Sequence, residues 1–283
     1  MPLFRDHKVL FIHVPKCGGT SMEKAFFERE DGTSGLGKHN LMAEHKPEWL
    51  ERKDIKLTHQ GAKQHLRYSE ILKLGIFKSH DDLKNNWTSF SFVRDPWDRF
   101  MSAIFFLHRK LRYPRAMEKC RTKKEVVRLV KSMAYGPDGV FFHGWSWEEF
   151  CANKDHFRTQ KSLVTHNGEV AVDFLGRYEN LNKDFNKFLV KFDLNKKFYH
   201  IRKKNGKKTK IAYAHDFSEA PNFVVPREIP KNGGRTATNC FSAFKSHFAD
   251  MGIKRYKDLY DDELREVVET TYAEDIEYFD YVF

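Results

Sequence analysis

The chain has 283 residues and a formal net charge of +11, because its 50 lysine and arginine residues outnumber its 39 aspartate and glutamate residues. Hydrophobic residues make up 40% of the sequence and phenylalanine alone fills 26 positions, so a large core can be buried and an intrinsically disordered chain is excluded. The positive charge favours an anionic partner, such as a phosphorylated cofactor, an acidic polysaccharide or nucleic acid.

The start of the chain predicts a strand, a glycine loop and a helix. Residues 8–14 (KVLFIHV) are an apolar run with β-branched side chains that ends at Pro15 and a pair of glycines. This pattern is typical of a buried strand that enters a tight loop. Residues 21–29 (SMEKAFFER) then place their apolar side chains on one face of a helix.

Strands and helices continue to alternate along the chain. Strands are predicted at 89–93 (SFSFV) and 170–175 (VAVDFL), and helices at 64–74, 96–107, 123–133, 182–192 and 264–276. The basic stretch 203–210 (KKNGKKTK) is typical of an exposed loop, and the weak pattern at about 200–250 suggests an insertion or lid. We therefore predict an α/β fold with a central, mostly parallel sheet flanked by helices, as a single domain over residues 1–283.

The cysteines and the apolar segments bear on the compartment. The four cysteines, at positions 17, 120, 151 and 240, are far apart and form no C-x-x-C pair, which favours free thiols in a reducing compartment over disulfides or zinc. The longest apolar stretches are too short to span a bilayer, and the start MPLFRDHK lacks a signal peptide. We expect a cytoplasmic protein without an integral membrane segment, although a chain trimmed of an anchor would look the same. The oligomeric state stays open.

A first candidate site lies between the first strand and the first helix, at 15–21 (PKCGGTS). The N-terminus of a helix offers backbone N–H groups and a positive dipole end to a phosphate. Glycines let the backbone approach the ligand, lysine adds a charge, and hydroxyls donate hydrogen bonds or cap the helix. The candidate cofactor-binding residues here are Lys16, Cys17, Gly18, Gly19, Thr20 and Ser21. A Walker A loop instead places its lysine after the glycines, and no acidic Walker B strand end is evident, so we expect nucleotide chemistry without a metal.

A second candidate site follows the strand 89–93, in residues 94–102 (RDPWDRFMS). Arg94 is expected at the carboxyl end of that strand, where open α/β sheets bind ligands. Ser102 lies about two helical turns further on, so both side chains can reach one phosphate if the loop folds back. The other polar residues of this stretch are as well explained by surface ion pairs and packing.

Together the two stretches resemble the PAPS-dependent sulfotransferases, in the group that contains bacterial and Golgi carbohydrate sulfotransferases (PAPS is 3′-phosphoadenosine 5′-phosphosulfate). Residues 11–22 (FIHVPKCGGTSM) are similar to the family's 5′-phosphosulfate loop, and 91–103 (SFVRDPWDRFMSA) to its 3′-phosphate motif. Segments 173–185 and 259–283 match more weakly, and 31–57 and 186–250 are poorly covered. The resemblance implies a P-loop-like three-layer fold, PAPS as donor and no metal. Cys17 departs from the threonine that is frequent in the family.

The resemblance also implies in-line attack of an acceptor hydroxyl on the sulfur of PAPS, with a carbohydrate as the acceptor. Lys16 would then act catalytically by stabilising the charge that develops on the leaving phosphate. The acceptor needs a general base, for which His59 is our first candidate, because residues 59–62 (HQGA) resemble the family segment that carries one. His80 and Glu44 are the alternatives.

Two further residues are candidates for nucleotide contact. Tyr178 would form one wall of the adenine site, although core packing explains it equally well. Arg235, in the glycine-containing segment 229–235 (IPKNGGR), would belong to a late loop that closes over the phosphates, or would sit in water.

Two other functions compete with sulfuryl transfer. A P-loop kinase would require ATP with magnesium, and the order of the loop residues argues against it. A nucleic-acid-binding module would explain the charge, but the basic residues are mixed with acids along the chain, and no zinc-finger or RNP-like pattern occurs. We therefore expect no nucleic acid among the partners.

Overall fold

The structure is a computed structural model that describes residues 3–4, 8–19, 22, 65–108, 113–134, 154–194, 202–204, 207–209 and 245–283. The chain divides into two compact units. The first comprises Met1–Val93 and Ser162–Glu228, and the second comprises Arg94–Lys161 and Ile229–Phe283. The single domain over residues 1–283 stays a prediction.

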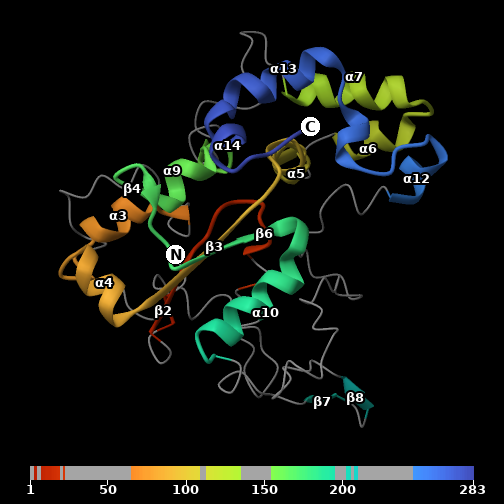
Figure 1. Ribbon diagram of the computed structural model, residues 1–283. Coiled ribbons are helices and arrows are strands. Elements are labelled where there is room, and N and C mark those ends of the chain that lie inside the picture. The colour runs from red at the N-terminus through yellow and green to blue at the C-terminus, as the bar shows by residue number, and fades with distance from the viewer. Residues whose placement is uncertain are drawn as a thin grey trace. The chain divides into compact units, whose positions relative to one another are not determined.

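A four-stranded sheet lies at the centre of the first unit. Its strands are, in spatial order, β1 (Leu3–Phe4), β2 (Val9–Ile12), β3 (Thr88–Val93) and β6 (Phe174–Arg177). β2, β3 and β6 run parallel, whereas β1 is antiparallel to β2 (Figure 1). Because the three parallel strands share one direction, their carboxyl ends lie at the same edge of the sheet, which is the edge that binds ligands in open α/β folds.

Aromatic rings hold α10 (Leu181–Lys191) against this sheet, and the helix runs beside β6 in Figure 1. Phe188 of α10 stacks on Phe90 of β3, with ring centroids 4.2 Å apart. Phe90 stacks in turn on Phe11 of β2, at 4.7 Å. Burying each such ring contributes roughly 1.5–3 kcal/mol, so this aromatic stack fixes the position of the helix.

Two short helices lie between β2 and β3 in the chain, α3 (Tyr68–Lys73) and α4 (His80–Asn86). The hydroxyl of Ser79 caps α4 by accepting the N–H of Asp82 at 3.1 Å. Within the first unit, α4 contacts β3, and α3 contacts β4 (Thr165–His166). Helices therefore flank a mostly parallel sheet, and the predicted α/β fold class is confirmed.

The predicted strand over 170–175 is wrong, because the chain forms two separate strands there. β5 (Glu169–Val170) pairs antiparallel with β4, and β6 begins only at Phe174. Between them the carboxylate of Asp173 accepts the backbone N–H and the hydroxyl of Ser89, at 2.8 and 2.6 Å. The backbone N–H of Asp173 also donates to the Ser89 carbonyl, at 2.9 Å, so side-chain and backbone hydrogen bonds together link these two residues. The predicted loop at 203–210 instead contains an antiparallel hairpin, β7 (Arg202–Lys204) with β8 (Lys207–Thr209).

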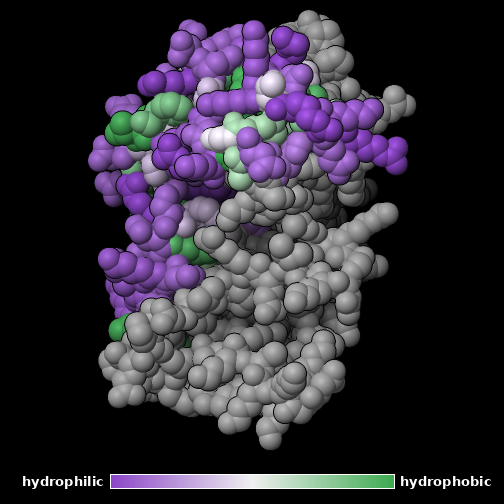
Figure 2. Space-filling view, turned by 90° about the vertical axis from the view of Figure 1, so that its right-hand side faces the viewer, coloured by the Kyte–Doolittle hydropathy of each residue, from purple (hydrophilic) through white to green (hydrophobic). Residues whose placement is uncertain are grey.

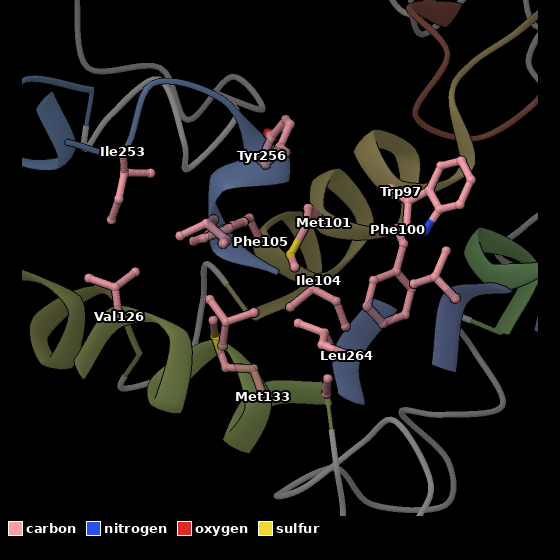
Figure 3. Close-up of a cluster of buried hydrophobic side chains, with 14 of the residues drawn as sticks. Trp97, Phe100, Met101, Ile104, Phe105, Val126, Met133, Ile253, Tyr256 and Leu264 are labelled. Atoms are coloured by element: carbon pink, nitrogen blue, oxygen red, sulfur yellow. The ribbon is translucent and has the colours of Figure 1, made fainter. Parts of the chain in front are cut away.

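The second unit is built mainly from helices around α5 (Pro96–His108). Figure 3 shows side chains of α5, among them Phe100, Ile104 and Phe105, packed into one buried hydrophobic cluster. Among its described residues this unit also contains α6 (Tyr113–Lys119), α7 (Lys123–Ala134), the 3₁₀ helices η5 (Lys154–Phe157) and η8 (Tyr256–Leu259), α12 (Lys245–Asp250), α13 (Asp262–Thr271) and α14 (Ala273–Tyr278), and α9 (Gln160–Val164) begins in it.

The coloured part of the face shown in Figure 2 is mostly polar. On the face shown in Figure 2, hydrophilic residues predominate and hydrophobic ones form only small areas. Within the described part of the chain, no helix combines the length and the apolar character needed to cross a membrane.

Candidate functional site

The loop that follows β2 contains two residues with positive φ. Lys16 and Gly18 are both left-handed, with φ of 67° and 82°. A residue other than glycine adopts this conformation only rarely, so Lys16 occupies a constrained position. Gly19 is helical, and the N–H of Met22 donates to the Gly18 carbonyl at 3.1 Å. Turns with left-handed residues at the start of a helix form concave sets of N–H groups that bind phosphate.

Two buried histidines lie behind this loop. His13 is 6% exposed and His65 is 3% exposed, and their rings meet edge to face with centroids 4.6 Å apart. Nδ1 of His65 lies 3.0 Å from the His13 carbonyl oxygen, so this nitrogen is the one that carries a hydrogen. A Cβ on Gly19 would lie 1.9 Å from Nε2 of His13. The His13 ring therefore requires glycine at the first helical position.

Tyr178 packs against the same loop. A Cβ on Gly18 would lie 3.2 Å from Cδ2 of Tyr178, and Tyr178 opens the 3₁₀ helix η6 (Tyr178–Asn180) directly after β6. The structure thus brings two of the predicted cofactor residues together. Cys17 is 1% exposed and its Sγ lies 3.6 Å from the Pro15 carbonyl, so its thiol is buried and any ligand contact falls to its backbone.

Arg94 comes directly after β3 and is 4% exposed. Its backbone N–H donates to Oε1 of Gln160, and its carbonyl accepts from Nε2 of the same side chain, both at 2.8 Å. The guanidinium lies over the ring of Tyr256, with Cζ 5.5 Å from the centroid. Both the backbone and the side chain of Arg94 are therefore held in place.

Asp95 caps the helix that begins after Arg94. Its Oδ1 accepts two N–H groups of the first turn of α5, at 3.0 and 3.2 Å, and its Oδ2 pairs with Lys257 at 2.8 Å. Since Asp95 already occupies this helix N-terminus, an anion bound near α5 depends on side chains rather than on helix N–H groups. Ser102 lies further along α5 and is 2% exposed.

The remaining site predictions fall partly outside the described residues. Thr20, Ser21, Arg235, and the candidate bases His59 and Glu44 all lie there. Of the described site residues, Lys16 and Tyr178 belong to the first compact unit, and Arg94 and Ser102 belong to the second.

His80, the alternative base, opens α4 with its imidazole already engaged. Its Nδ1 lies 3.1 Å from the hydroxyl of Tyr68, and its ring stacks on His166 at 5.2 Å. Burial, and secondly the charge of Asp173, raise the pKa of Tyr68 well above its usual value, so this hydroxyl stays neutral in its hydrogen bond with Nδ1. These contacts join α3, α4 and β4 and give His80 a structural explanation.

Three of the residues that shape these loops were missed by sequence reasoning. His13 is hidden in the apolar run of the first strand. His65 and Gln160 lie 52 and 66 residues from their partners, and no local signal points to either pairing. The capping role of Asp95 was detectable, since aspartate directly before a proline at a helix start is an N-cap signal.

Comparison with known proteins agrees with these observations. The sequence profile of the Sulfotransferase family matches residues 3–282, which is nearly the whole chain. No curated protein and no solved structure matches. The profile match spans the loop after β2, the Arg94 segment and the weaker C-terminal resemblance, on a confirmed α/β fold. The chain therefore belongs to the sulfotransferase family, whose members transfer sulfuryl groups.

Proposed function

We propose that this sulfotransferase takes its sulfuryl group from PAPS and transfers it to a hydroxyl group of a carbohydrate. The observation that carries the proposal is the loop after β2, in which Lys16 and Gly18 are left-handed and Gly19 begins a helix. Its backbone conformation and its charge suit the 5′-phosphosulfate end of the donor.

The loop residues fit this ligand chemically. Neither Gly18 nor Gly19 has a side chain between the backbone and a bound phosphate, so N–H groups can approach the oxygens closely. Lys16 adds a full positive charge on the same turn. As the donor bond breaks, negative charge builds on the bridging phosphate oxygen, and Lys16 would stabilise it electrostatically.

At the other end of the donor, Arg94 and Ser102 would hold the 3′-phosphate. Arginine binds phosphate through paired charge-assisted hydrogen bonds, and a serine hydroxyl adds a third. Support comes from the position of Arg94 at the carboxyl end of β3 and from its fixed backbone. Tyr178, which packs against Gly18, would flank the nucleotide beside the loop.

The reaction would be an in-line displacement. The acceptor oxygen attacks sulfur, the bond from sulfur to the bridging phosphate oxygen breaks with its electron pair on that oxygen, and adenosine 3′,5′-bisphosphate leaves. The hydroxyl proton passes to a general base. His59 remains the proposed base on the strength of the family resemblance, and the contacts of His80 with Tyr68 and His166 weigh against that alternative.

The acceptor class rests on two supports. The net charge of +11 suits an acidic glycan, and the motifs resemble the carbohydrate-modifying group of the family. Transfer of labelled sulfate from PAPS to a panel of glycans, phenols and small alcohols tests this directly. Glycans should be the labelled products, and exclusive labelling of phenols would overturn the acceptor assignment while leaving the donor assignment intact.

A thermal-shift comparison tests the donor. Adenosine 3′,5′-bisphosphate without added metal should raise the melting temperature, because a ligand that binds only the folded state stabilises it. ATP with magnesium should have the smaller effect. The opposite order would favour a kinase, and a response to mixed-sequence DNA alone would favour nucleic-acid binding.

Substitution of the histidines tests the base. His59→Ala should abolish transfer while bisphosphate binding stays near the wild-type level, because a base acts on the acceptor rather than on the donor. His80→Ala serves as the matched variant and should keep transfer once its folding has been checked. Turnover that survives in His59→Ala but is lost in a folded His80→Ala would move the base to His80.

A further inference from the structure

Gln160 forms an unusual pairing with the residue that follows β3. Its side-chain amide makes two hydrogen bonds to Arg94, one to the backbone N–H and one to the backbone carbonyl, each 2.8 Å long. An antiparallel strand would offer one residue the same pair of hydrogen bonds, so the amide takes the place of a backbone partner for Arg94. The two backbone partners also fix which end of the amide carries the oxygen.

The position of Gln160 is itself fixed by a buried carboxylate. The two oxygens of Asp275 accept the backbone N–H groups of Gln160 and Lys161, both at 2.8 Å. Gln160 and Asp275 are each 0% exposed. The carboxylate therefore caps the start of α9 and holds the amide in register with Arg94.

Arg99 completes this network from α5. Its guanidinium lies 3.9 Å from Asp275 and donates to the carbonyls of Arg158, at 2.6 Å, and His156, at 3.3 Å. Arg99 is 1% exposed and its Cζ lies 5.0 Å from the centre of the Tyr272 ring. Buried polar groups of this kind are costly unless they are hydrogen-bonded, and both terminal nitrogens of Arg99 donate to carbonyls of one short segment of chain.

The side chain of Arg94 is oriented separately. Tyr256, labelled in Figure 3, belongs to the hydrophobic cluster of the second unit and places its ring beneath the Arg94 guanidinium. A cation above an aromatic face is attracted to it and loses rotational freedom. The backbone hydrogen bonds to Gln160 and the ring contact with Tyr256 thus fix the orientation of Arg94, which is only 4% exposed.

We propose that Gln160 is a positioning residue for nucleotide binding, which acts by holding the backbone of Arg94 so that its guanidinium meets the 3′-phosphate of the donor. The inference rests on the proposed function, because it assumes that Arg94 binds this phosphate. Misplacing a charged ligand group by even a small distance weakens a bidentate contact strongly.

The test compares two nucleotides that differ only in the 3′-phosphate. Dissociation constants for adenosine 3′,5′-bisphosphate and adenosine 5′-monophosphate are measured by calorimetry for the wild type, Gln160→Met and Arg94→Ala. Gln160→Met keeps the volume of the side chain and removes both hydrogen bonds. We expect it to weaken bisphosphate binding about tenfold and to leave 5′-monophosphate binding unchanged. Added to Arg94→Ala, the same substitution should have no further effect on bisphosphate binding.

Two further variants separate the loss of the hydrogen bonds from a general loss of stability. Val130→Ala opens a cavity in the hydrophobic cluster of the same unit, so it should lower the melting temperature without changing the ratio of the two affinities. Gln160→Glu keeps an acceptor for the Arg94 N–H but loses the donor to the Arg94 carbonyl, and protonation of the new carboxyl restores a donor. Its affinity ratio should therefore move toward the wild-type value as the pH falls, measured beside the wild type at each pH.

The outcomes separate the two proposals. A wild-type chain that binds both nucleotides equally would contradict the role of Arg94 and the proposed function with it. A wild type that prefers the bisphosphate, together with Gln160 variants that keep the full preference, would overturn the positioning role of Gln160 alone. If the Gln160 variants bind both nucleotides more weakly by the same factor, the positioning role is also overturned, because that result indicates general destabilisation.

Discussion

At the scale of single residues, Gly19 and His13 form a steric pair beneath the candidate phosphate loop. The imidazole of His13 occupies the place of a Cβ at position 19, with Nε2 only 1.9 Å from where that atom would lie. Gly19→Ala should therefore shift the loop, destabilise the chain by about 1–3 kcal/mol and weaken bisphosphate binding. Chemical denaturation and calorimetry measure the two effects.

Removing the opposing ring provides the control for this prediction. In a His13→Ala background the added methyl group has room. Gly19→Ala should therefore lower the free energy of unfolding by less than it does in the wild type. Gly168 is the comparison, because a Cβ there meets nothing within 4 Å and only its φ of 86° opposes alanine. Gly168→Ala should cost the same in both backgrounds, and additive effects for the Gly19 pair would contradict the steric explanation.

At the scale of elements, Asp173 joins the starts of β3 and β6. Its carboxylate accepts the N–H and hydroxyl of Ser89 and pairs with Lys84 at 2.7 Å. Asp173→Ala leaves buried donors of β3 without an acceptor, which should lower the free energy of unfolding by about 1–3 kcal/mol. Lys84→Met removes only the partly exposed ion pair and should cost less than about 1 kcal/mol. Denaturant midpoints for the two variants check this ranking, and an equal loss in both would contradict it.

The capping of α7 should make stability depend on pH. The carboxylate of Glu125 accepts the N–H groups of Arg121 and Thr122, at 2.7 and 3.0 Å, and these bonds lower its pKa. A carboxyl whose pKa is lowered by folding stabilises the native state above its ordinary pKa, and this contribution is lost as the pH falls through the folded-state value. The stability difference between wild type and Glu125→Gln should therefore be present at neutral pH and shrink as the pH falls through the lowered folded-state pKa of Glu125.

Glu118 supplies the matched control for that measurement. It lies exposed at the end of α6, in the same unit, and Glu118→Gln removes the same charge without removing a helix cap. Urea unfolding followed by circular dichroism should show no comparable pH dependence for this variant. A gap between wild type and Glu125→Gln that stays constant across the pH range would rule out the capping explanation.

Local patterns predicted several of these elements but not all of them. The strand at 89–93 and the helix at 96–107 were predictable because their apolar periodicity and their proline are local signals. The strand predicted at 170–175 is two separate strands, and its residue Asp173 bonds to Ser89, 84 residues away, a pairing that no local pattern indicates. The hairpin β7–β8 carried a local signal that was overlooked, since its two runs flank Asn205 and Gly206, a dipeptide typical of hairpin turns.

In the candidate site, too, contiguous motifs were predictable and contacts between remote residues were not. The glycine loop and Arg94 were predictable because each motif is contiguous and follows a strand. Tyr178 packs on Gly18, and its role as a wall of the adenine site stays a prediction. His65 and Gln160 were not predictable, because each reaches a loop that is remote in sequence, and only the folded chain brings the pair together.

At the scale of the whole molecule, the two candidate phosphate-binding motifs belong to different compact units, yet the proposed donor requires both. If Lys16 serves the 5′-phosphosulfate and Arg94 the 3′-phosphate, each substitution should impair a different part of one ligand. Lys16→Ala should weaken binding of adenosine 5′-monophosphate and spare the 3′-monophosphate. Arg94→Ala should do the reverse, and both should weaken the bisphosphate by about tenfold or more.

Calorimetric titration of the three nucleotides at constant ionic strength measures this selectivity, since the net charge of +11 adds a non-specific attraction that salt screens. Lys183→Ala, an exposed cation of α10, controls for the loss of one positive charge and should weaken all three ligands equally and only slightly. Substitutions at Lys16 and Arg94 that impair the same nucleotides to the same degree would mean that charge alone drives binding. In that case the two motifs would not bind the two ends of one donor.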